Sequence, residues 1–478
     1  MELKRIRVIG GGLAGPEAAL QAARFGCPVD LFEMRPTRST EAHQTADFAE
    51  LVCSNSLKSE SENTAPWLLK QEMRLAGSIL LAEADASAVP AGHALAVDRV
   101  EFSRRVAARI AAEPRITVHR EEITHLDESD TETITILATG PLTSPALATE
   151  LQRLTDSTHL AFYDSISPIV DATTIDMEKV YFAARWDKGT ADYINCPFTK
   201  EEYEAFLEAL TAAETVPAKE WEQIPTESDG KELSSFRVAG GPASPRQPET
   251  PAYFEGCLPI EETARRGPDT LRFGPMKPAG LTNPKTGKWP YAVVQLRQEN
   301  LRADSYNLVG FQNHLKFGEQ QRVLRLIPGL ENATFLRYGQ IHRNTYINAP
   351  TLLTDTLQLK QHPNILIAGQ LSGVEGYTES IASGMLAGRY AAALAQGERP
   401  TPAPRASANG SLTHYITHAE SKRFQPANIT FDLLLPLEEE LRKKIRDKKE
   451  RHRIQCDRAL EAWKTWLDQT VPCAAGAS

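Results

Sequence analysis

The stretch from Arg5 to Glu33 decides the fold, and it reads RIRVIGGGLAGPEAALQAARFGCPVDLFE. Its first residues form a short apolar run that ends at Gly10, which is typical of a β-strand. The middle is rich in alanine, carries Pro16 where the first turn of a helix accepts proline, and stops at Gly26. A second apolar run then closes at Glu33. Strand, helix and strand in this order predict a parallel βαβ unit.

Three glycines of this stretch, Gly10, Gly12 and Gly15, form the pattern Gly-x-Gly-x-x-Gly between the predicted strand and the predicted helix. In such a motif the first glycine permits a tight turn, the second lets the backbone approach a pyrophosphate, and the third allows close helix packing. The helix N-terminus offers N–H groups to the phosphates, and an acid ending the second strand accepts hydrogen bonds from a ribose. We therefore predict a dinucleotide site made by Gly10, Gly11, Gly12, Leu13, Ala14, Gly15 and Glu33.

Two downstream segments favour FAD over NAD as the dinucleotide. Residues 132–140 are predicted to form a strand that runs into a loop, and the turn Ala138-Thr139-Gly140 ends it, as in many flavoproteins of the two-dinucleotide type. A buried-type strand over 364–369 ends at Gly369 and places Gln370 where such proteins usually carry an acid that contacts the ribityl chain. The helix predicted to open near Thr378 would direct its positive end at the flavin. A second glycine motif is absent, so NADH or NADPH would visit the flavin without a Rossmann domain of its own.

The domain organisation follows from these pieces. We predict an α/β protein whose Rossmann-like, glutathione-reductase-type FAD domain is discontinuous, with residues 1–150 as its first part and 330–400 as its second. An inserted α+β domain occupies 151–329, a linker 401–411, and a helical segment with a basic strip 412–478. A further amphipathic helix is expected over 98–114, with Val100, Phe102, Val106 and Ile110 among its apolar positions, and a surface loop over 225–251.

Composition excludes several classes of protein. The chain has 478 residues, 41% hydrophobic and 24% charged, with a net charge of −9, so it is neither disordered nor a binder of nucleic acid by bulk positive charge. No apolar run is long enough to span a membrane and no signal peptide is apparent, so we expect a cytoplasmic protein without a membrane partner. The six cysteines are too sparse for a disulfide framework, and we see no ligand spacing among the histidines, so no metal site is expected.

A basic strip runs from Arg442 to Arg453 and contains eight Lys or Arg residues against two acids, a local charge of +6. Such a run is often a solvated helix face, but on an acidic protein it is also a candidate docking site for RNA phosphates. Further candidates for RNA contact are basic residues close in sequence to aromatic ones, namely Lys316, Arg337 and Arg343 beside Phe317, Tyr338 and Tyr346.

Two cysteines stand in turn-like surroundings, Cys53 in LVCSNSL and Cys257 in FEGCLPIE. A cysteine outside a disulfide usually packs as a small hydrophobic side chain, so a catalytic role for either competes with that simpler interpretation. Cys257 lies between Gly256 and a nearby proline, which favours a turn over a helix face. The other four cysteines (Cys27, Cys196, Cys456 and Cys473) are expected to be structural.

Longer strings in this chain resemble one bacterial family, the folate- and FAD-dependent tRNA uracil-5-methyltransferases. The shared strings occur in the same order and are GGGLAGPEAA, LFEMRP, ELVCSNSLKS, FEGCLPIE, LRFGPMKPAGL, VVQLRQEN, LVGFQNHLKFGEQ and YGQIHRNTYINAP. The resemblance extends from Arg5 to about Trp466. The stretch 225–251 is longer than is usual for the family, and the tail around Cys473 has no counterpart in it.

The resemblance implies an activity: formation of 5-methyluridine at position 54 in the T loop of tRNA. 5,10-Methylenetetrahydrofolate would give the carbon, reduced FAD the electrons, and NADH or NADPH would re-reduce the flavin. Cys257 matches the family's proposed nucleophile, whose thiolate adds to uracil C6, and Cys53 matches its second cysteine, a base at C5 or a guard of the flavin. His314 or His342 would stack on the pterin, with Lys316 and Arg343 as further substrate contacts. No obligatory protein partner is evident.

Three other functions stay open at this point. One is the related flavoprotein that modifies the wobble uridine of tRNA with a partner GTPase, although it carries a longer helical C-terminal region. Another is a plain FAD oxidoreductase that acts on a small metabolite. The third is an RNA-binding flavoprotein without catalytic activity.

Overall fold

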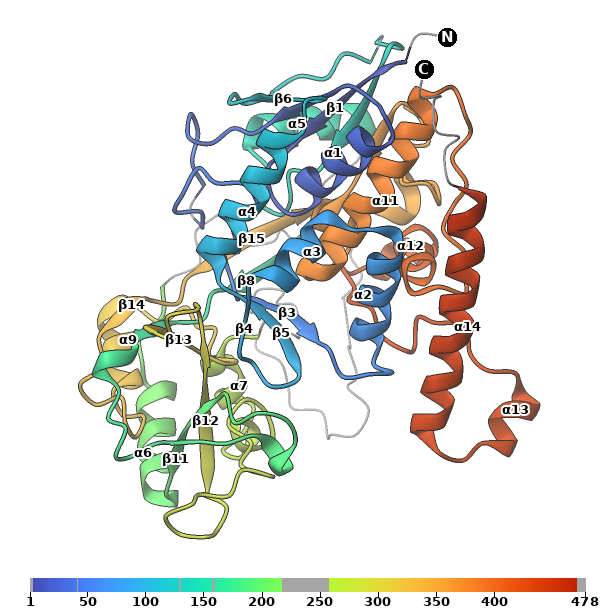
Figure 1. Cartoon of the computed structure of the whole chain (residues 1–478). Helices are drawn as coiled ribbons and strands as arrows, with labels where there is room; N and C mark the ends of the chain where they lie inside the picture. Colours follow the sequence, from blue (N-terminus) through green and yellow to red (C-terminus); the bar gives the residue numbers. More distant parts are fainter. Residues whose placement is uncertain (1–2, 41, 129, 157–159, 217–257, 471–478) are drawn as a thin grey trace, which may run out of the picture.

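The computed structural model describes residues 3–40, 42–128, 130–156, 160–216 and 258–470. Within them the chain forms a larger lobe around a parallel sheet, a smaller lobe inserted into it, and a C-terminal helical segment that lies along the larger lobe (Figure 1). Two hydrophobic cores correspond to the two lobes: one surrounds the parallel sheet and its helices, and the other the sheet of the inserted lobe.

The parallel sheet of the larger lobe confirms the predicted βαβ unit. Its strand order is β16-β7-β1-β2-β6, with every neighbouring pair parallel. Its strands are β1 (Arg5–Ile9), β2 (Val29–Phe32), β6 (Ile116–His119), β7 (Thr133–Leu137) and β16 (Ile365–Ile367). Val8 of β1 is in register with Leu31 of β2 and Ile136 of β7. Strands from positions more than 200 residues apart therefore join one sheet, as the discontinuous domain requires.

Two helices lie side by side against this sheet, α1 (Ala14–Arg24) and α11 (Tyr377–Ala395) (Figure 1). They approach closely because small residues line the contact. A Cβ atom at Gly384 would stand 2.3 Å from the carbonyl oxygen of Ala14, and one at Gly388 would stand 2.4 Å from that of Ala18. Glycine at these two positions of α11 thus sets how near the helix comes to the N-terminal turn of α1.

Further helices and a small antiparallel sheet complete the larger lobe. They are α2 (Ala65–Ala76), α3 (Ile79–Ala86), α4 (Arg99–Ala112), α5 (Pro145–Thr155), α10 (Ala349–Leu352), β3 (Ser56–Ser59), β4 (Ala88–Val89) and β5 (Ala94–Val97). The predicted helix over 98–114 is α4, which Asp98 caps through its side chain. Phe102, Val106 and Ile110 are buried as expected, but Val100 is 76% exposed, because it lies in the first turn on the solvent side.

The inserted lobe is built on an antiparallel sheet with strand order β10-β11-β12-β13-β9-β14. Its strands are β9 (Ile169–Asp171), β10 (Tyr181–Phe182), β11 (Ile194–Phe198), β12 (Ala292–Gln298), β13 (Ser305–Leu308) and β14 (Phe335–Arg337). Its helices are α6 (Lys200–Thr211), α7 (Ile260–Arg265), α8 (Thr270–Phe273) and α9 (Phe317–Leu324). The chain enters by β8 (Leu160–Ser165) and returns by β15 (Ile341–Tyr346), which pair antiparallel. The loop expected over 225–251 lies outside the described residues.

The C-terminal segment contains α12 (Ala408–His418), α13 (Glu439–Lys444) and α14 (Lys448–Gln469). The sequence from 436 to 469 therefore forms two helical pieces. The prediction of a linker over 401–411 is wrong at its end, because residues 408–411 form the start of α12 and are buried. The physical reason is a distant carboxylate: Glu72 accepts hydrogen bonds from the backbone N–H groups of Ala408 and Asn409, which stabilises the start of the helix. Among the described residues, no helix has the length and apolar character needed to cross a membrane.

Candidate cofactor and active site

A cleft of about 990 Å³ opens at the carboxyl ends of the parallel strands, where open α/β sheets bind their ligands. It is lined by the glycine turn after β1, the residues after β2, the turn after β7, Gly369 and Gln370 after β16, and the first turn of α11. All the residues predicted for cofactor binding belong to this wall except Gly15, which lies directly behind it. The predicted pieces, separated widely in sequence, thus surround one cavity.

The glycine turn has the geometry that a pyrophosphate site needs. Gly10 has φ of +116°, and a Cβ there would stand 2.4 Å from the carbonyl oxygen of Ala138. A Cβ at Gly15 would stand 1.8 Å from the carbonyl oxygen of Gly10, so only glycine allows α1 to start this close to β1. A Cβ at Gly12 would meet no atom within 4 Å, which leaves open space for a ligand beside this backbone. These features fit a bound dinucleotide.

Glu33, at the end of β2, is buried and fully engaged with its own lobe. One carboxylate oxygen accepts a hydrogen bond from Gly11 N at 2.7 Å, and the other accepts from the backbone N and the Nε of Arg35, each at 2.9 Å. Burial by itself raises the pKa of Glu33, but the hydrogen bonds and positive charge of Arg35 outweigh it and lower the pKa. Glu33 is therefore an ionised anchor of the glycine turn, and its contact with a ribose stays a prediction.

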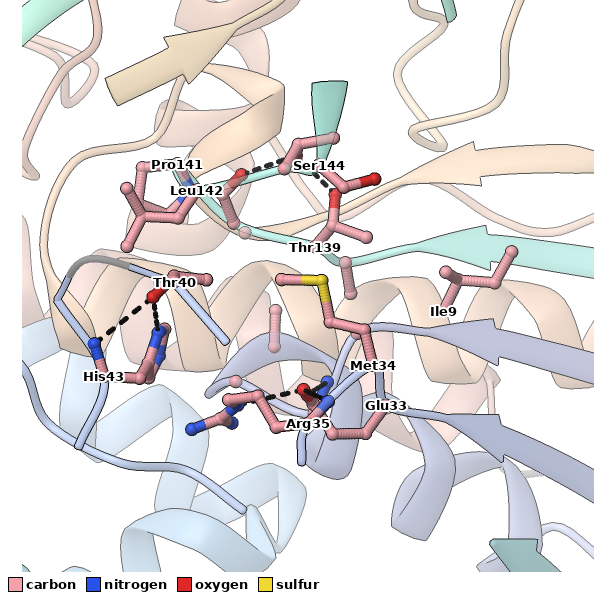
Figure 2. A pocket seen from close by; sticks show the side chains of 18 of the residues that line it. Ile9, Glu33, Met34, Arg35, Thr40, His43, Thr139, Pro141, Leu142 and Ser144 are labelled. Atoms are coloured by element: carbon pink, nitrogen blue, oxygen red, sulfur yellow. Dashed lines mark hydrogen bonds and ion pairs between the residues drawn. The ribbon is translucent and has the colours of Figure 1, made fainter. Parts of the chain in front are cut away.

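The residues after β7 form the opposite wall of the cleft (Figure 2). Thr139 Oγ1 and Thr143 Oγ1 lie 2.6 Å apart, and Thr143 Oγ1 donates to the carbonyl oxygen of Gly140. Met34, which was not predicted as a site residue, extends from the Glu33 side toward this wall (Figure 2). Arg35, which belongs to the shared string LFEMRP, also lines the cleft, as do Thr40 and His43, which lie in none of the shared strings.

The segment after β16 closes the cleft from a third side. Gly369 N donates to Ser383 Oγ at 2.8 Å, which fixes this turn on α11. Gln370 lies at the cleft as predicted, and its Nε2 donates to Glu375 Oε2 at 2.5 Å. The side-chain amide of Gln370 thus lies beside the carboxylate of Glu375. The predicted helix starts at Tyr377, one residue earlier than expected, and its first turn lines the cleft.

Cys53 lies next to the cleft, in the turn that follows the lining residue Val52. The hydroxyl oxygen of Tyr377 accepts hydrogen bonds from Cys53 N at 2.7 Å and Ser54 N at 3.2 Å. Burial raises the pKa of Tyr377, and the neighbouring Cys53 adds to the shift, so the phenol stays neutral. The turn that carries the thiol is therefore held at the N-terminus of α11.

A buried polar network joins this turn to the inserted lobe. Arg297 of β12 donates from Nε to Asn55 Oδ1 at 3.0 Å and from Nη2 to Ser54 Oγ at 2.9 Å. Arg99 forms an ion pair with Glu299 at 2.6 Å and donates to the carbonyl oxygen of Leu51 at 2.7 Å. Cys53 is thus at the seam between the two lobes.

Within the part of the chain that the structure describes, none of the remaining predicted site residues lines the cleft. Cys257 lies outside the described residues, as do the side chains of His342 and Arg343. His314 is buried in the inserted lobe, with Nε2 3.2 Å from Glu261 Oε1; burial lowers the pKa of His314 to about 4 and raises that of Glu261 to about 7. Lys316 forms an ion pair with Glu214 at 2.5 Å.

The basic strip lies on α13, the residues after it and the start of α14. Part of its charge is neutralised locally: Lys443 pairs with Glu439 at 2.7 Å, and Arg453 pairs with Glu450 at 2.6 Å. A second depression, of about 840 Å³, lies beside the strip. Its lining includes Arg442, Lys448, Arg451, and His452 stacked on Phe431 at 3.7 Å. Cationic and aromatic groups therefore occur together at this surface.

Comparison with known proteins agrees with this geometry. The sequence matches the model of the family described as glucose inhibited division protein A over residues 5–232 and 243–399. In structure the chain is similar to GidA of Aquifex aeolicus, with a TM-score of 0.68 and 17% identity, over 98% of this chain and 74% of that longer one. This likeness supports the fold.

Curated relatives are far closer in sequence. The chain is 64% identical over 467 residues to the methylenetetrahydrofolate–tRNA-(uracil-5-)-methyltransferase TrmFO of Koribacter versatilis, covering 98% of each chain. It is 58% identical to the protein of that name from Solibacter usitatus, covering 98% of this chain and all of that one. For the protein of that name from Enterococcus faecalis the identity is 52%, over 96% of this chain and 97% of that one. Since the match extends over nearly both full lengths, the chain belongs to the TrmFO family of methylenetetrahydrofolate–tRNA-(uracil-5-)-methyltransferases.

Proposed function

We propose that this chain is a folate- and FAD-dependent tRNA uracil-5-methyltransferase, which transfers the carbon of 5,10-methylenetetrahydrofolate to C5 of a uracil. The observation that carries the proposal is the 64% identity to a relative of that name over 98% of both chains. The cleft supports it independently, because its wall combines a dinucleotide turn with a cysteine at its edge. In more detail, the proposed product is 5-methyluridine at position 54 in the T loop of tRNA. The proposed location of the reaction is the cytoplasm.

The cleft residues would hold FAD in a defined orientation. The backbone around Gly12 and the first turn of α1 would bind the pyrophosphate, and Gln370 with the N-terminus of α11 would face the isoalloxazine side. When bound, reduced FAD supplies the electrons that convert the transferred carbon to a methyl group, and NADH or NADPH restores them. The walls supplied by Met34 and Leu142 would exclude water from the ring.

The two matched cysteines would divide the chemistry on the uracil ring. The thiolate of Cys257 would add to C6, which makes C5 nucleophilic, and it would leave when the C5–C6 double bond reforms. Cys53 would accept the C5 proton. Its position beside the cleft, in a turn whose backbone N–H of Cys53 donates to the neutral Tyr377 hydroxyl, supports that role.

The tRNA would reach the cleft with its target base turned out of the loop, because C5 and C6 are inaccessible in a stack. We place the backbone contact on the basic strip, whose Arg442, Lys448 and Arg451 gather at one depression with a stacked His452–Phe431 pair. His314, Lys316, His342 and Arg343 stay candidates for the folate and the RNA. Binding through phosphates makes affinity fall steeply with salt.

Incubation of the full chain with FAD, NADPH, undermodified tRNA and carbon-labelled methylenetetrahydrofolate tests the proposal. The expected result is label in 5-methyluridine at position 54, lost in Cys257→Ala and Cys53→Ala. Cys27→Ala is the matched control, because burial raises the pKa of Cys27 to about 11 and that thiol lies away from the cleft. Label at the wobble uridine would favour the related tRNA-modifying flavoprotein, and FAD turnover without label in RNA would favour a small-molecule oxidoreductase.

A further inference from the structure

Three potential metal ligands gather outside the cofactor cleft, on the helix α12 and the turn before β16. His414 and His418 are four residues apart on one face of α12, and their rings stack with centroids 4.2 Å apart. Asp355 faces them from the turn between α10 and β16. One ligand atom from each of the three residues lies within 4.8 Å of the others, and His418 Nδ1 is 3.4 Å from Asp355 Oδ1.

We propose that Asp355, His414 and His418 form a binding site for one divalent transition-metal ion, of which Zn²⁺ is the representative. Two neutral imidazoles and one carboxylate are a ligand set that zinc accepts, with water completing a tetrahedron. Zinc bonds of about 2.0–2.1 Å at a tetrahedral angle place two ligand atoms about 3.3 Å apart. The distance between His418 Nδ1 and Asp355 Oδ1 is close to that value. Mg²⁺ and Ca²⁺ prefer oxygen ligands and would not compete.

Both halves of the site are held in place by the fold, so little ordering is needed to bind an ion. On one side α12 is docked by its buried Leu412 and Ile416. On the other side the turn around Asp355 is closed by a hydrogen bond from Thr354 N to the carbonyl oxygen of Gln358 at 2.9 Å.

A direct contact already joins the two halves, since Thr417 Oγ1 donates to Asp355 Oδ1 at 3.0 Å. His418 and Asp355 remain about half exposed, with side-chain exposures of 49% and 50%. An ion therefore has a path from solvent to all three ligands.

No ligand spacing among the histidines is expected from the sequence, whereas His414 and His418 lie four residues apart on one helix. Two histidines at positions i and i+4 lie on the same side of a helix, which is a chelating arrangement. Both histidines lie in the segment predicted as helical from residue 412, and the carboxylate comes from a distant turn. The site is independent of the proposed methyl transfer, and its consequence is structural: an ion would tie α12 to the turn that leads into β16.

Calorimetric titration of the full chain with Zn²⁺, in a reductant that does not bind metal, tests the site. The expected result is one ion per chain at the site, with affinity reduced by more than about tenfold in His414→Ala, His418→Ala and Asp355→Asn. His125→Ala is the matched control, because His125 is 73% exposed and is not one of the three proposed ligands. It should titrate as wild type, and Mg²⁺ should give no heat in any of the proteins.

Thermal unfolding gives a second measurement that does not depend on methyl transfer. Zn²⁺ should raise the melting temperature of the wild type and of His125→Ala, and should leave that of His414→Ala and His418→Ala unchanged. Equal zinc affinity in the wild type and the three ligand variants would overturn the site, and so would absence of binding to the wild type. Retained binding in Asp355→Asn alone would overturn the carboxylate as a ligand.

Discussion

Replacing Gly384 with alanine should weaken FAD binding more than the same replacement at Gly388, although both add one methyl group to α11. A Cβ at Gly384 would stand 2.3 Å from the carbonyl oxygen and 2.7 Å from the Cα of Ala14. A Cβ at Gly388 would stand 2.4 Å and 2.9 Å from the same atoms of Ala18. All four atoms belong to the backbone of α1, so neither clash can be relieved by turning a side chain. In both variants the helices must separate.

The expected magnitude follows from two opposing contributions. Overpacking costs about 1–3 kcal/mol, and replacing glycine by alanine inside a helix returns up to about 1 kcal/mol. We therefore expect each variant to lose about 1–2 kcal/mol of stability. Only Ala14 belongs to the wall of the cleft, whereas Ala18 lies one turn deeper along α1. If the displacement at Ala14 is carried into binding, the affinity for FAD falls about 5- to 30-fold in Gly384→Ala, since 1.4 kcal/mol is tenfold.

Apoprotein titrated with FAD, followed by flavin fluorescence, measures the affinity, and thermal unfolding of the apoprotein measures the packing cost. Similar losses of stability with a selective loss of FAD affinity in Gly384→Ala would support the argument. Ala393→Gly, at a partly exposed position of the same helix, is a control for helix propensity. Wild-type FAD affinity in Gly384→Ala, together with an unchanged melting temperature, would refute the view that this contact positions the glycine turn.

Three further perturbations test individual contacts. Tyr377→Phe removes the acceptor of two backbone N–H groups in the Cys53 turn; leaving buried donors unpaired costs about 1–3 kcal/mol, so methyl transfer should fall and the rate of Cys53 alkylation should change. Glu33→Gln places an amide N–H against donors at Gly11 or Arg35, so it should lower FAD retention on gel filtration, whereas a variant that binds FAD normally would contradict this role. Burial raises the pKa of Glu72 from 4.5 to about 7, so the stability that it contributes is complete below pH 4.5 and is lost as the pH rises through about 7. The melting temperature of Glu72→Gln should therefore decline less than that of the wild type between pH 5 and pH 8, and parallel declines would exclude this carboxyl as the cause.

The cofactor side of the molecule was predictable from sequence, because its constraints act on the backbone and are local. Gly10 needs a positive φ and Gly15 needs the absence of a Cβ, so the motif, the strand before it and the helix after it are readable together. The candidate active-site side, around Cys53, depends on contacts between residues that are distant in sequence. Tyr377 meets Cys53 across 324 positions of sequence, and no periodicity in either segment encodes that hydrogen bond.

The start of α12 shows how tertiary structure overrides local composition. The stretch GERPTPAPRASANGS has the proline, glycine and serine content of a linker. Its last residues are nevertheless helical, because the carboxylate of Glu72 accepts from Ala408 N at 2.6 Å and from Asn409 N at 2.9 Å. Trp463 of α14 donates from Nε1 to the carbonyl oxygen of the same Glu72. One residue of α2 therefore contacts two C-terminal helices. The sequence around Glu72 contains no pattern that predicts these contacts.

The network around Asn55 fixes the loop that carries Cys53 from both lobes. The Asn55 side chain is fully buried, donates to the carbonyl oxygens of Val97 and Gln298, and accepts from Arg297 and Asn307. Removing any of these hydrogen-bond partners of Asn55 would leave a buried charge or amide unpaired, which costs free energy. The conformation of the loop that carries Cys53 is therefore fixed by β12 and β13 of the inserted lobe together with residues of the larger lobe.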